Sequence, residues 1–316
     1  MSGMKILNEK SLEIDPQQWC SNIESFIRTK FIESKKDGIL VTVSGGLDSS
    51  VVVSLATKAV GKDNVTALML PERFGNPDAN LYGKLIIRQL DIKSKKIYIN
   101  PIIRSLKISD LLLTFLGGRE LWKNRIEKVK QKKGDEVYKG YVKMLRGERV
   151  ETFQKYTSKI NGRQRARLLY AYKYSEDNNL LLVGSTHKTE RSVGLFVKFG
   201  IDDCADIMPL KNIYRSQILQ IGQHMGIPTE ILNRTPNPDM VPGVTDKYVS
   251  YLDLPAQQVD LILLGLENKM TPKEIAAQLK IIEEKVLQIQ EIVRLTETQR
   301  NPSLAPIMTV KTNDNE

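Results

Sequence analysis

Residues 38–50 read Gly-Ile-Leu-Val-Thr-Val-Ser-Gly-Gly-Leu-Asp-Ser-Ser, and this stretch decides the fold. Its β-branched start, residues 38–43, predicts a short buried strand. The glycine pair predicts a turn, and the apolar periodicity of residues 49–60 predicts a helix directly after it. Because residues 65–70 form a second β-branched run, the stretch opens a βαβ unit.

The alternation of strands and helices continues on both sides of this unit. An amphipathic helix is expected over residues 15–33, where Trp19, Ile23, Phe26 and Ile27 recur at helical spacing. A helix over 81–90 and a third strand over 95–99 follow. Alternating strands and helices are typical of an α/β fold with a doubly wound parallel sheet and helices on both faces.

The pattern changes after about residue 105. Residues 105–160 carry charged helical sequence and are interpreted as a helical insertion. The α/β rhythm returns with a helix over 164–174, a strand over 180–184 and a helix over 214–225, so roughly five strands are expected. Proline-rich residues 233–246 predict a loop, and residues about 250–305 a helical C-terminal region. We therefore predict one domain spanning 1–316.

Bulk composition narrows the function classes. Hydrophobic residues make up 41% of the 316, no run of eighteen apolar residues occurs, and the first thirty residues are not those of a signal peptide. With two cysteines, Cys20 and Cys204, the chain lacks a disulfide framework, and a reducing cytoplasm is the expected compartment. The net charge of +10, concentrated over residues 123–167, favours attraction of a nucleotide over nucleic-acid binding.

The turn after the first strand has the chemistry of a phosphate site. Backbone N–H groups converge at a helix N-terminus, and the helix dipole favours anions there. The glycines let the backbone approach phosphate oxygens, and the serine hydroxyls add donors. Asp48 would repel a phosphate unless a cation lay between them, so it predicts Mg²⁺. The predicted nucleotide-binding residues are Ser44, Gly45, Gly46, Leu47, Asp48, Ser49 and Ser50.

The alternative for this loop is a ligand-free Gly-Gly turn with a polar helix cap. The absence of a Gly-Lys-Ser/Thr ending argues against a kinase-type P-loop. The heptapeptide 44–50 does, however, resemble the SGGxDS signature of the ATP pyrophosphatases, which adenylate a substrate and release pyrophosphate. This resemblance implies an α/β fold of the adenine nucleotide alpha hydrolase type.

Further segments resemble the NAD synthetases of that superfamily. Residues 184–190 (Gly-Ser-Thr-His-Lys-Thr-Glu) look like GTxxKxE, and 196–200 (Phe-Val-Lys-Phe-Gly) look like FTKYG. Residues 161–167 match N-x-[KR]-x-R-x-R. The other similar segments are 206–210, 214–217, 226–228, 235–239 and 296–302. The resemblance covers about residues 39–306 in colinear order and leaves 105–159 unmatched.

This resemblance implies a reaction and a set of roles. ATP adenylates the carboxylate of nicotinic acid adenine dinucleotide, pyrophosphate leaves, and ammonia converts the acyl-adenylate to the amide of NAD. Asp48 and Glu190 are the implied Mg²⁺ ligands. Arg215 stands where the family has a phosphate-binding lysine, and Asp202 or Asp203 would help to deprotonate ammonium, with Asp203 preferred. The remaining implied ATP- or substrate-binding residues are Arg165, Thr186, Lys198, Asp206 and Asn237.

The resemblance also implies partners. NAD synthetases similar to this chain are homodimers whose dinucleotide site lies between subunits. Neither Cys20 nor Cys204 resembles a glutaminase nucleophile, so ammonia is expected to be free or delivered by a separate glutaminase. No membrane partner is expected.

Three alternatives remain. The chain departs from the family pattern at Asn237 and at residues 243–247 (Gly-Val-Thr-Asp-Lys), which replace GQ[ST]DE, so a paralogue amidating a different carboxylate is one alternative. A tRNA-modifying ATP pyrophosphatase could exploit the basic segment. Residues 270–286 resemble a helix-turn-helix and would suggest DNA binding, although such a helix pair is more often a packing element.

Overall fold

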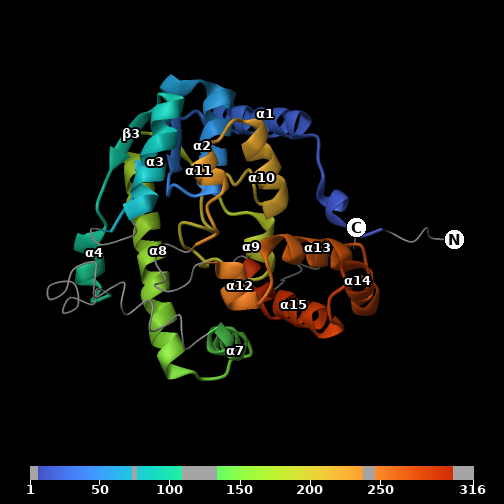
Figure 1. Ribbon diagram of the computed structural model, residues 1–316. Helices are drawn as coiled ribbons and strands as arrows, with labels where there is room; N and C mark the ends of the chain where they lie inside the picture. Colours follow the sequence, from blue (N-terminus) through green and yellow to red (C-terminus); the bar gives the residue numbers. More distant parts are fainter. Residues whose placement is uncertain (1–5, 73–76, 109–133, 238–245, 302–316) are drawn as a thin grey trace, which may run out of the picture.

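A parallel sheet stands at the centre of the molecule (Figure 1). The computed structural model describes residues 6–72, 77–108, 134–237 and 246–301. Within them the sheet has four strands in the order β3-β2-β1-β4. The strands are β1 (Gly38–Thr42), β2 (Val65–Met69), β3 (Lys93–Lys96) and β4 (Leu180–Val183). All the pairings are parallel, which confirms the predicted doubly wound fold.

Strand β1 lies at the centre because it is apolar on both faces. Ile39 and Val41 belong to one hydrophobic cluster, and Leu40, between them, belongs to another. Alternate side chains of a strand point to opposite faces, and a strand buried on both faces must be apolar throughout. At the sheet edge, the side chains of β3 are exposed and three of its four residues are lysines, which discourages pairing with another chain.

Helices cover both faces. The cluster around Ile39 includes residues of α1 (Pro16–Ser34), α2 (Leu47–Val60), α3 (Pro77–Leu90) and α10 (Arg215–His224). The cluster around Leu40 includes residues of α4 (Asn100–Ser105) and of the long helix α8 (Glu151–Asp177). Figure 1 shows α8 running beside the sheet and far beyond it.

A second core lies among the C-terminal helices (Figure 1). It is built from α12 (Lys247–Leu252), α13 (Ala256–Glu267), α14 (Pro272–Leu279) and α15 (Glu283–Leu295), followed by α16 (Glu297–Arg300). The 3-10 helix η1 (Glu9–Leu12) and helix α7 (Gly134–Leu145) also contribute to it. Segments from both ends of the chain and from the insertion therefore share one core.

Helices α14 and α15 are the predicted helix-turn-helix. Thr271 and Glu274 form a reciprocal capping box at the start of α14. Ile275 and Val286 are fully buried in the second core. The packing interpretation is therefore supported over DNA binding, because the apolar faces of both helices are used inside the protein.

Several expected boundaries were wrong. The third strand is Lys93–Lys96 and not 95–99, because Ile99 is fully buried at the start of α4. The helix expected over 164–174 is only the second half of α8, which begins at Glu151 without a break. In place of a fifth strand, the described residues show one parallel bridge from Val183 to Ile207.

The remaining short elements connect the sheet to the helices around it. They are η2 (Lys62–Asn64), α9 (Lys188–Ser192) and α11 (Thr229–Leu232). Residues 109–133 of the expected insertion, with the first part of its basic sequence, and 238–245 of the expected loop lie outside the described residues. Across the described part of the chain, each helix is too short or too polar to span a bilayer.

Candidate active site

Hydrogen bonds of its own serines fix the shape of the loop between β1 and α2. The Ser49 hydroxyl donates to the Gly46 carbonyl (3.2 Å) and accepts from the Ser44 backbone N–H (3.3 Å). The Ser50 hydroxyl also donates to the Gly46 carbonyl (2.8 Å), while the Gly46 N–H donates to the Ser44 hydroxyl (3.3 Å). Leu47 begins α2 with its side chain in the core, so it can serve a ligand only through its backbone.

Gly45 makes this turn possible. Its φ is +77°, in the left-handed region, and a Cβ there would lie 2.8 Å from the backbone nitrogen of Gly83 in α3. The Gly45 carbonyl accepts a hydrogen bond from Arg234 (3.1 Å). A side chain at this position would push the loop away from α3, so glycine is required for packing as well as for φ.

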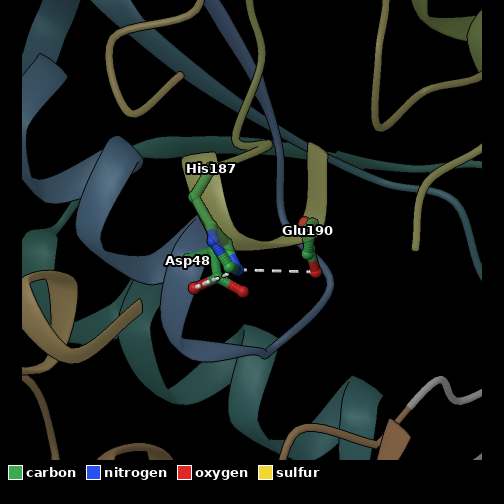
Figure 2. A group of neighbouring side chains, drawn as sticks. All are labelled: Asp48, His187 and Glu190. Carbon is green, nitrogen blue, oxygen red and sulfur yellow. Dashed lines mark ion pairs between the residues drawn. The ribbon is translucent and has the colours of Figure 1, made fainter. Parts of the chain in front are cut away.

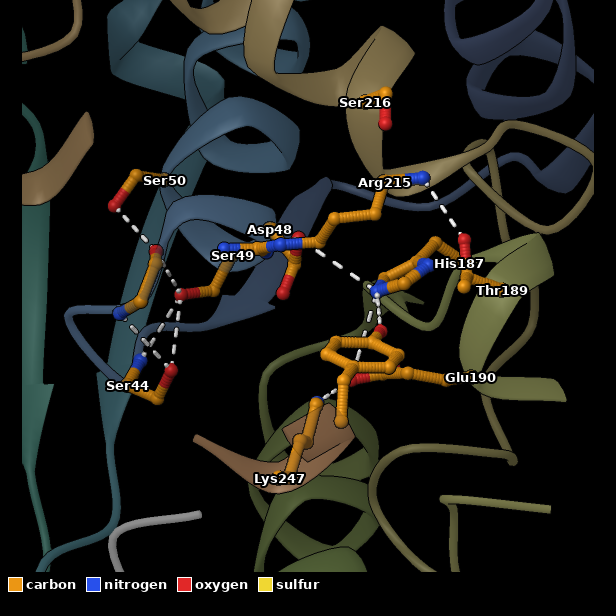
Figure 3. A network of polar contacts seen from close by, with 12 residues as sticks. Ser44, Asp48, Ser49, Ser50, His187, Thr189, Glu190, Arg215, Ser216 and Lys247 are labelled. Carbon is orange, nitrogen blue, oxygen red and sulfur yellow. Dashed lines mark hydrogen bonds and ion pairs between the residues drawn. The ribbon is translucent and has the colours of Figure 1, made fainter. Parts of the chain in front are cut away.

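Asp48 lies in the first turn of α2 and pairs with Arg215, the first residue of α10 (Figure 3). Arg215 Nη1 donates to Asp48 Oδ1 over 2.5 Å, and the two side chains are 12% and 20% exposed. Burial alone would raise the pKa of Asp48, but the positive charges around it, that of Arg215 first and that of Lys247 after it, act together with the Arg215 hydrogen bond and hold that pKa below its ordinary value. Asp48 is therefore an anion.

His187, Glu190 and Lys247 complete the centre of the site. His187 Nε2 lies 3.6 Å from Glu190 Oε1, 4.0 Å from Asp48 Oδ1 and 3.3 Å from the Tyr248 hydroxyl (Figure 2). Burial lowers the pKa of His187 more than the two carboxylates raise it, so the ring is neutral near pH 7. The Lys247 ammonium donates to Glu190 Oε1 (Figure 3).

Asp48, His187 and Glu190 could hold a metal ion. One ligand atom from each lies within 4.8 Å of the others. Carboxylate oxygens are the protein ligands that Mg²⁺ prefers, whereas imidazole suits transition metals. The two carboxylates therefore fit a magnesium ion shared with phosphate oxygens, and His187 fits a supporting role beside it.

Asp260 fixes the two helix starts that carry these residues. Its side chain is fully buried on α13. One carboxylate oxygen accepts from the Ser216 N–H (2.8 Å) and hydroxyl (2.6 Å), and the other accepts from the Thr189 hydroxyl (2.5 Å). Thr189 in turn accepts from the Arg215 N–H (2.9 Å). We name this set (Asp260, Ser216, Thr189) the Asp260 clamp, and it ties α9 and α10 to the second core.

The two candidate bases near the site have different surroundings. Asp203 pairs with Arg191 and accepts from the Phe199 N–H (3.2 Å), so its carboxylate is committed to the protein. Asp202 accepts from Gln164, and its pKa rises to about 6 through burial and through the negative charge of Glu190. Asp203 as the base remains a prediction, but Asp202 has the environment of a proton acceptor near neutral pH.

Two other predicted residues bind the backbone of neighbouring segments. The Arg165 guanidinium donates to the Lys198 carbonyl (3.2 Å), and the Lys198 ammonium donates to the Thr298 carbonyl (3.0 Å). Arg167, two residues along α8, donates to the Leu70 carbonyl (3.1 Å) and to the Glu72 carboxylate (3.1 Å), both beyond the end of β2. The two arginines of this motif therefore serve different segments.

Three predicted residues lie on loops at the ends of elements. Asp206 accepts from the Leu182 N–H of β4 (2.8 Å), and the Asn237 N–H donates to the Thr235 carbonyl (2.7 Å). The buried Thr186 hydroxyl has no hydrogen-bond partner among the described residues. Since buried polar groups are normally paired, this hydroxyl is suited to a ligand.

Sequence reasoning missed part of this site. Lys247 was noticed only as the loss of a family glutamate, and Asp260 was not noticed. A charged residue within the apolar run Val259-Asp-Leu-Ile-Leu-Leu264 is the signal that could have identified Asp260, because a lone buried carboxylate needs partners. His187, which sequence analysis gave only as part of residues 184–190, lies at the centre of the site.

Comparison with known proteins agrees with this geometry. The family model for NAD synthase matches residues 19–112 and 121–303. The chain is 32% identical to the NH3-dependent NAD+ synthetase of Coprothermobacter proteolyticus, covering 80% of this chain and 86% of that protein. It is 34% identical to the enzyme of the same name from Thermotoga neapolitana, covering 82% and 89%.

Solved structures share the fold. NMN synthetase from Francisella tularensis superimposes with a TM-score of 0.68 at 22% identity, covering 94% of this chain and all of that one. NH3-dependent NAD synthetase from Campylobacter jejuni gives a TM-score of 0.65 at 20% identity, covering 93% and all of that chain. At these identities the likeness concerns the fold alone.

A parallel sheet with a Ser-Gly-Gly loop at the carboxyl end of its central strand defines an ATP pyrophosphatase of the SGGxDS class. The family match covers most of the chain. Residues 105–159 were expected to be unmatched, and this was wrong, because the family model includes all of them except 113–120. The chain belongs to the NAD synthase family.

Proposed function

We propose that this chain is an ammonia-dependent NAD synthetase that forms NAD, AMP and pyrophosphate from ATP, ammonia and nicotinic acid adenine dinucleotide. The observation that carries the proposal is the meeting of the phosphate loop with Asp48, Glu190 and Arg215 at one end of the sheet. Open α/β sheets bind ligands at the carboxyl ends of their strands.

The first step activates the acid. A carboxylate oxygen of the dinucleotide attacks the α-phosphorus of ATP, and the bond to the pyrophosphate oxygen breaks. Backbone N–H groups of the loop from Ser44 to Ser50 and the Ser44 hydroxyl would hold the leaving pyrophosphate, while the buried Ser49 and Ser50 hydroxyls keep the loop in shape through the Gly46 carbonyl. Arg215 would neutralise the growing charge on the pyrophosphate. Asp48 and Glu190 would hold Mg²⁺, which supplies further charge neutralisation when bound.

The second step forms the amide. Ammonia attacks the acyl carbon, and AMP leaves with one oxygen of the original carboxylate. Ammonium must first lose a proton, and Asp202 is the acceptor that its raised pKa supports, with Asp203 holding Arg191 beside it. Thr186, with its unpaired hydroxyl, is proposed to contact the nucleotide together with Arg165, Lys198, Asp206 and Asn237.

We further propose that the chain works as a homodimer in the cytoplasm and takes free ammonia or ammonia from a separate glutaminase. The proposal rests on the family resemblance and on the cysteines, since Cys20 is a buried free thiol of α1 and Cys204 a free thiol between the Asp203 and Asp206 contacts. Light scattering of the purified protein tests the dimer, and comparison of glutamine with ammonium as nitrogen source tests the ammonia.

An isotope experiment tests the chemistry. With ¹⁸O in the carboxylate of nicotinic acid adenine dinucleotide, we expect one ¹⁸O in AMP, none in pyrophosphate, and NAD formation that depends on ATP and ammonium. Asp48→Ala and Glu190→Ala should abolish turnover, whereas Asp91→Asn, at an exposed carboxylate paired with Lys62, should not. Turnover with nicotinic acid mononucleotide but not with the dinucleotide would transfer the assignment to a paralogue with another acceptor.

A further inference from the structure

Both carboxylates proposed to hold metal are already paired with cationic side chains of the protein. Asp48 accepts from Arg215, and Glu190 accepts from Lys247. The Lys247 and Glu190 side chains are only 17% and 10% exposed, so water screens this pair poorly. Among the described residues, Lys247 is the only lysine or arginine in an ion pair with Glu190.

The backbone of α12 aims Lys247 at Glu190. Asp246 caps the helix by accepting from the Tyr248 and Val249 N–H groups (2.8 and 3.1 Å), and the Lys247 N–H donates to the Pro236 carbonyl (3.0 Å). Its ammonium also lies 5.5 Å from the centre of the Tyr248 ring. Lysine is a flexible point charge, so the backbone can stay fixed while the ammonium moves.

We propose that Lys247 is a counter-cation built into the site. Its ammonium pairs with Glu190 in the absence of metal and nucleotide, and it moves to pair with the phosphates when a divalent cation and ATP bind together. The inference rests on the proposed function for the placement of metal and ATP. An ammonium and a divalent cation repel each other at one carboxylate, so metal entry must displace Lys247. Phosphate oxygens arriving with the metal give the displaced ammonium a new anionic partner.

This exchange makes metal and nucleotide binding cooperative. Without ligands, Arg215 and Lys247 balance the charges of Asp48 and Glu190. A divalent cation that binds alone has to break the Lys247–Glu190 pair and leaves Lys247 without an anionic partner. When ATP binds with the metal, its phosphates become the new partner of Lys247. The lysine also explains a departure from the family pattern, since the similar segment GQ[ST]DE ends in glutamate where this chain has Lys247.

Binding of Mn²⁺, followed by the paramagnetic resonance of the free ion, tests the proposal without turnover. For the wild-type chain, α,β-methylene-ATP should tighten Mn²⁺ binding at least about tenfold after subtraction of Mn²⁺ held by the analogue alone. Lys247→Gln should bind Mn²⁺ about tenfold more tightly than wild type without analogue, and the cooperativity should shrink accordingly. The matched control is Lys285→Gln, at the exposed pair with Asp253, which should behave as wild type.

Two more variants keep the test decisive. Lys247→Arg retains a cation and should keep the weak Mn²⁺ binding of wild type, and the Glu190→Gln background should erase the effect of Lys247→Gln. The proposal is overturned if Lys247→Gln binds Mn²⁺ no more tightly than wild type without analogue, or if wild type shows no cooperativity. Because the assay needs neither ammonia nor the dinucleotide, a failure of NAD formation would overturn the proposed function alone.

Discussion

Replacing Asp260 with asparagine should damage both stability and turnover, because the Asp260 clamp holds the starts of α9 and α10. The asparagine oxygen can still accept from both Ser216 donors. The asparagine amide nitrogen then faces the Thr189 hydroxyl, which already accepts from the Arg215 N–H. The Thr189 hydroxyl proton, which Asp260 accepts in the wild-type chain, is left without an acceptor. One hydrogen bond to a charged group is lost in a buried site.

The loss of that hydrogen bond should lower the free energy of unfolding by about 1–3 kcal/mol. For a chain of this size the melting temperature should fall by about 2–5 °C. Since Thr189 and Ser216 position Arg215, a displacement of α10 should also lower kcat by about ten- to a hundredfold. Burial raises the pKa of Asp260, so removal of the charge offsets some of the stability cost and favours the lower end of the stability range.

Calorimetry and steady-state assays on Asp260→Asn, Thr189→Val and the double variant measure both effects. The two changes break one interaction, so their effects should be clearly less than additive. Asp253→Asn, at an exposed carboxylate just before α13, is the control and should match wild type. A kcat of Asp260→Asn within twofold of wild type would refute the positioning argument, and fully additive unfolding energies would refute the shared hydrogen bond.

Four further results are expected. Arg215→Lys should lower kcat by about tenfold or more, measured by pyrophosphate release, because an ammonium loses the fork geometry of the guanidinium; an unchanged kcat would contradict this. Asp202 has a folded-state pKa of about 6, above its value of 3.8 in the unfolded chain, so its contribution to stability is complete below pH 3.8 and is lost as pH rises through 6. The free energy of unfolding of Asp202→Asn, measured in urea, should therefore rise by about 1–3 kcal/mol relative to that of wild type between pH 4 and pH 7. If the two free energies changed in parallel with pH, the raised pKa of Asp202 would be refuted. Gly45→Ala should cost about 1–2 kcal/mol from the positive φ alone, and more from the approach to α3, with ATP affinity falling in calorimetric titration; wild-type values of both would disprove the tight turn. Removal of divalent cations with EDTA should abolish NAD formation and Mg²⁺ should restore it, whereas turnover in EDTA would exclude a metal at Asp48 and Glu190.

The elements that sequence reasoning placed well are those whose signals are local. The strand and helix on either side of the phosphate loop, and the helix pair within residues 270–286, depend on neighbours within a few residues. Strand β3 was misplaced because its Lys-Ser-Lys-Lys sequence is that of an exposed edge, whereas the apolar residues beyond it belong to the core. The unbroken α8 was missed because its charged first half was assigned to the helical insertion and its second half to the α/β pattern.

The residues of the site also fall into those that could be predicted from the sequence and those that could not. Asp48 and Glu190 lie in the helices that come next after two neighbouring parallel strands, β1 and β4, so their meeting could be predicted from topology. Their partners could not be predicted in this way, because Arg215, Lys247 and Asp260 come from three later helices whose packing no local pattern specifies. The roles of the site residues in binding ATP remain predictions.

The position of Asp260 late in the chain has a consequence for synthesis on the ribosome. The phosphate loop emerges early, yet the starts of α9 and α10 gain their hydrogen bonds to Asp260 only when α13 has been made and packed with α7 and η1 into the second core. A nascent chain that stops before α13 would carry the four strands of the described sheet and lack the Asp260 clamp beside Arg215. Competence to handle ATP would then arise only near the end of translation, when segments distant in sequence meet, and contacts of this kind form slowly.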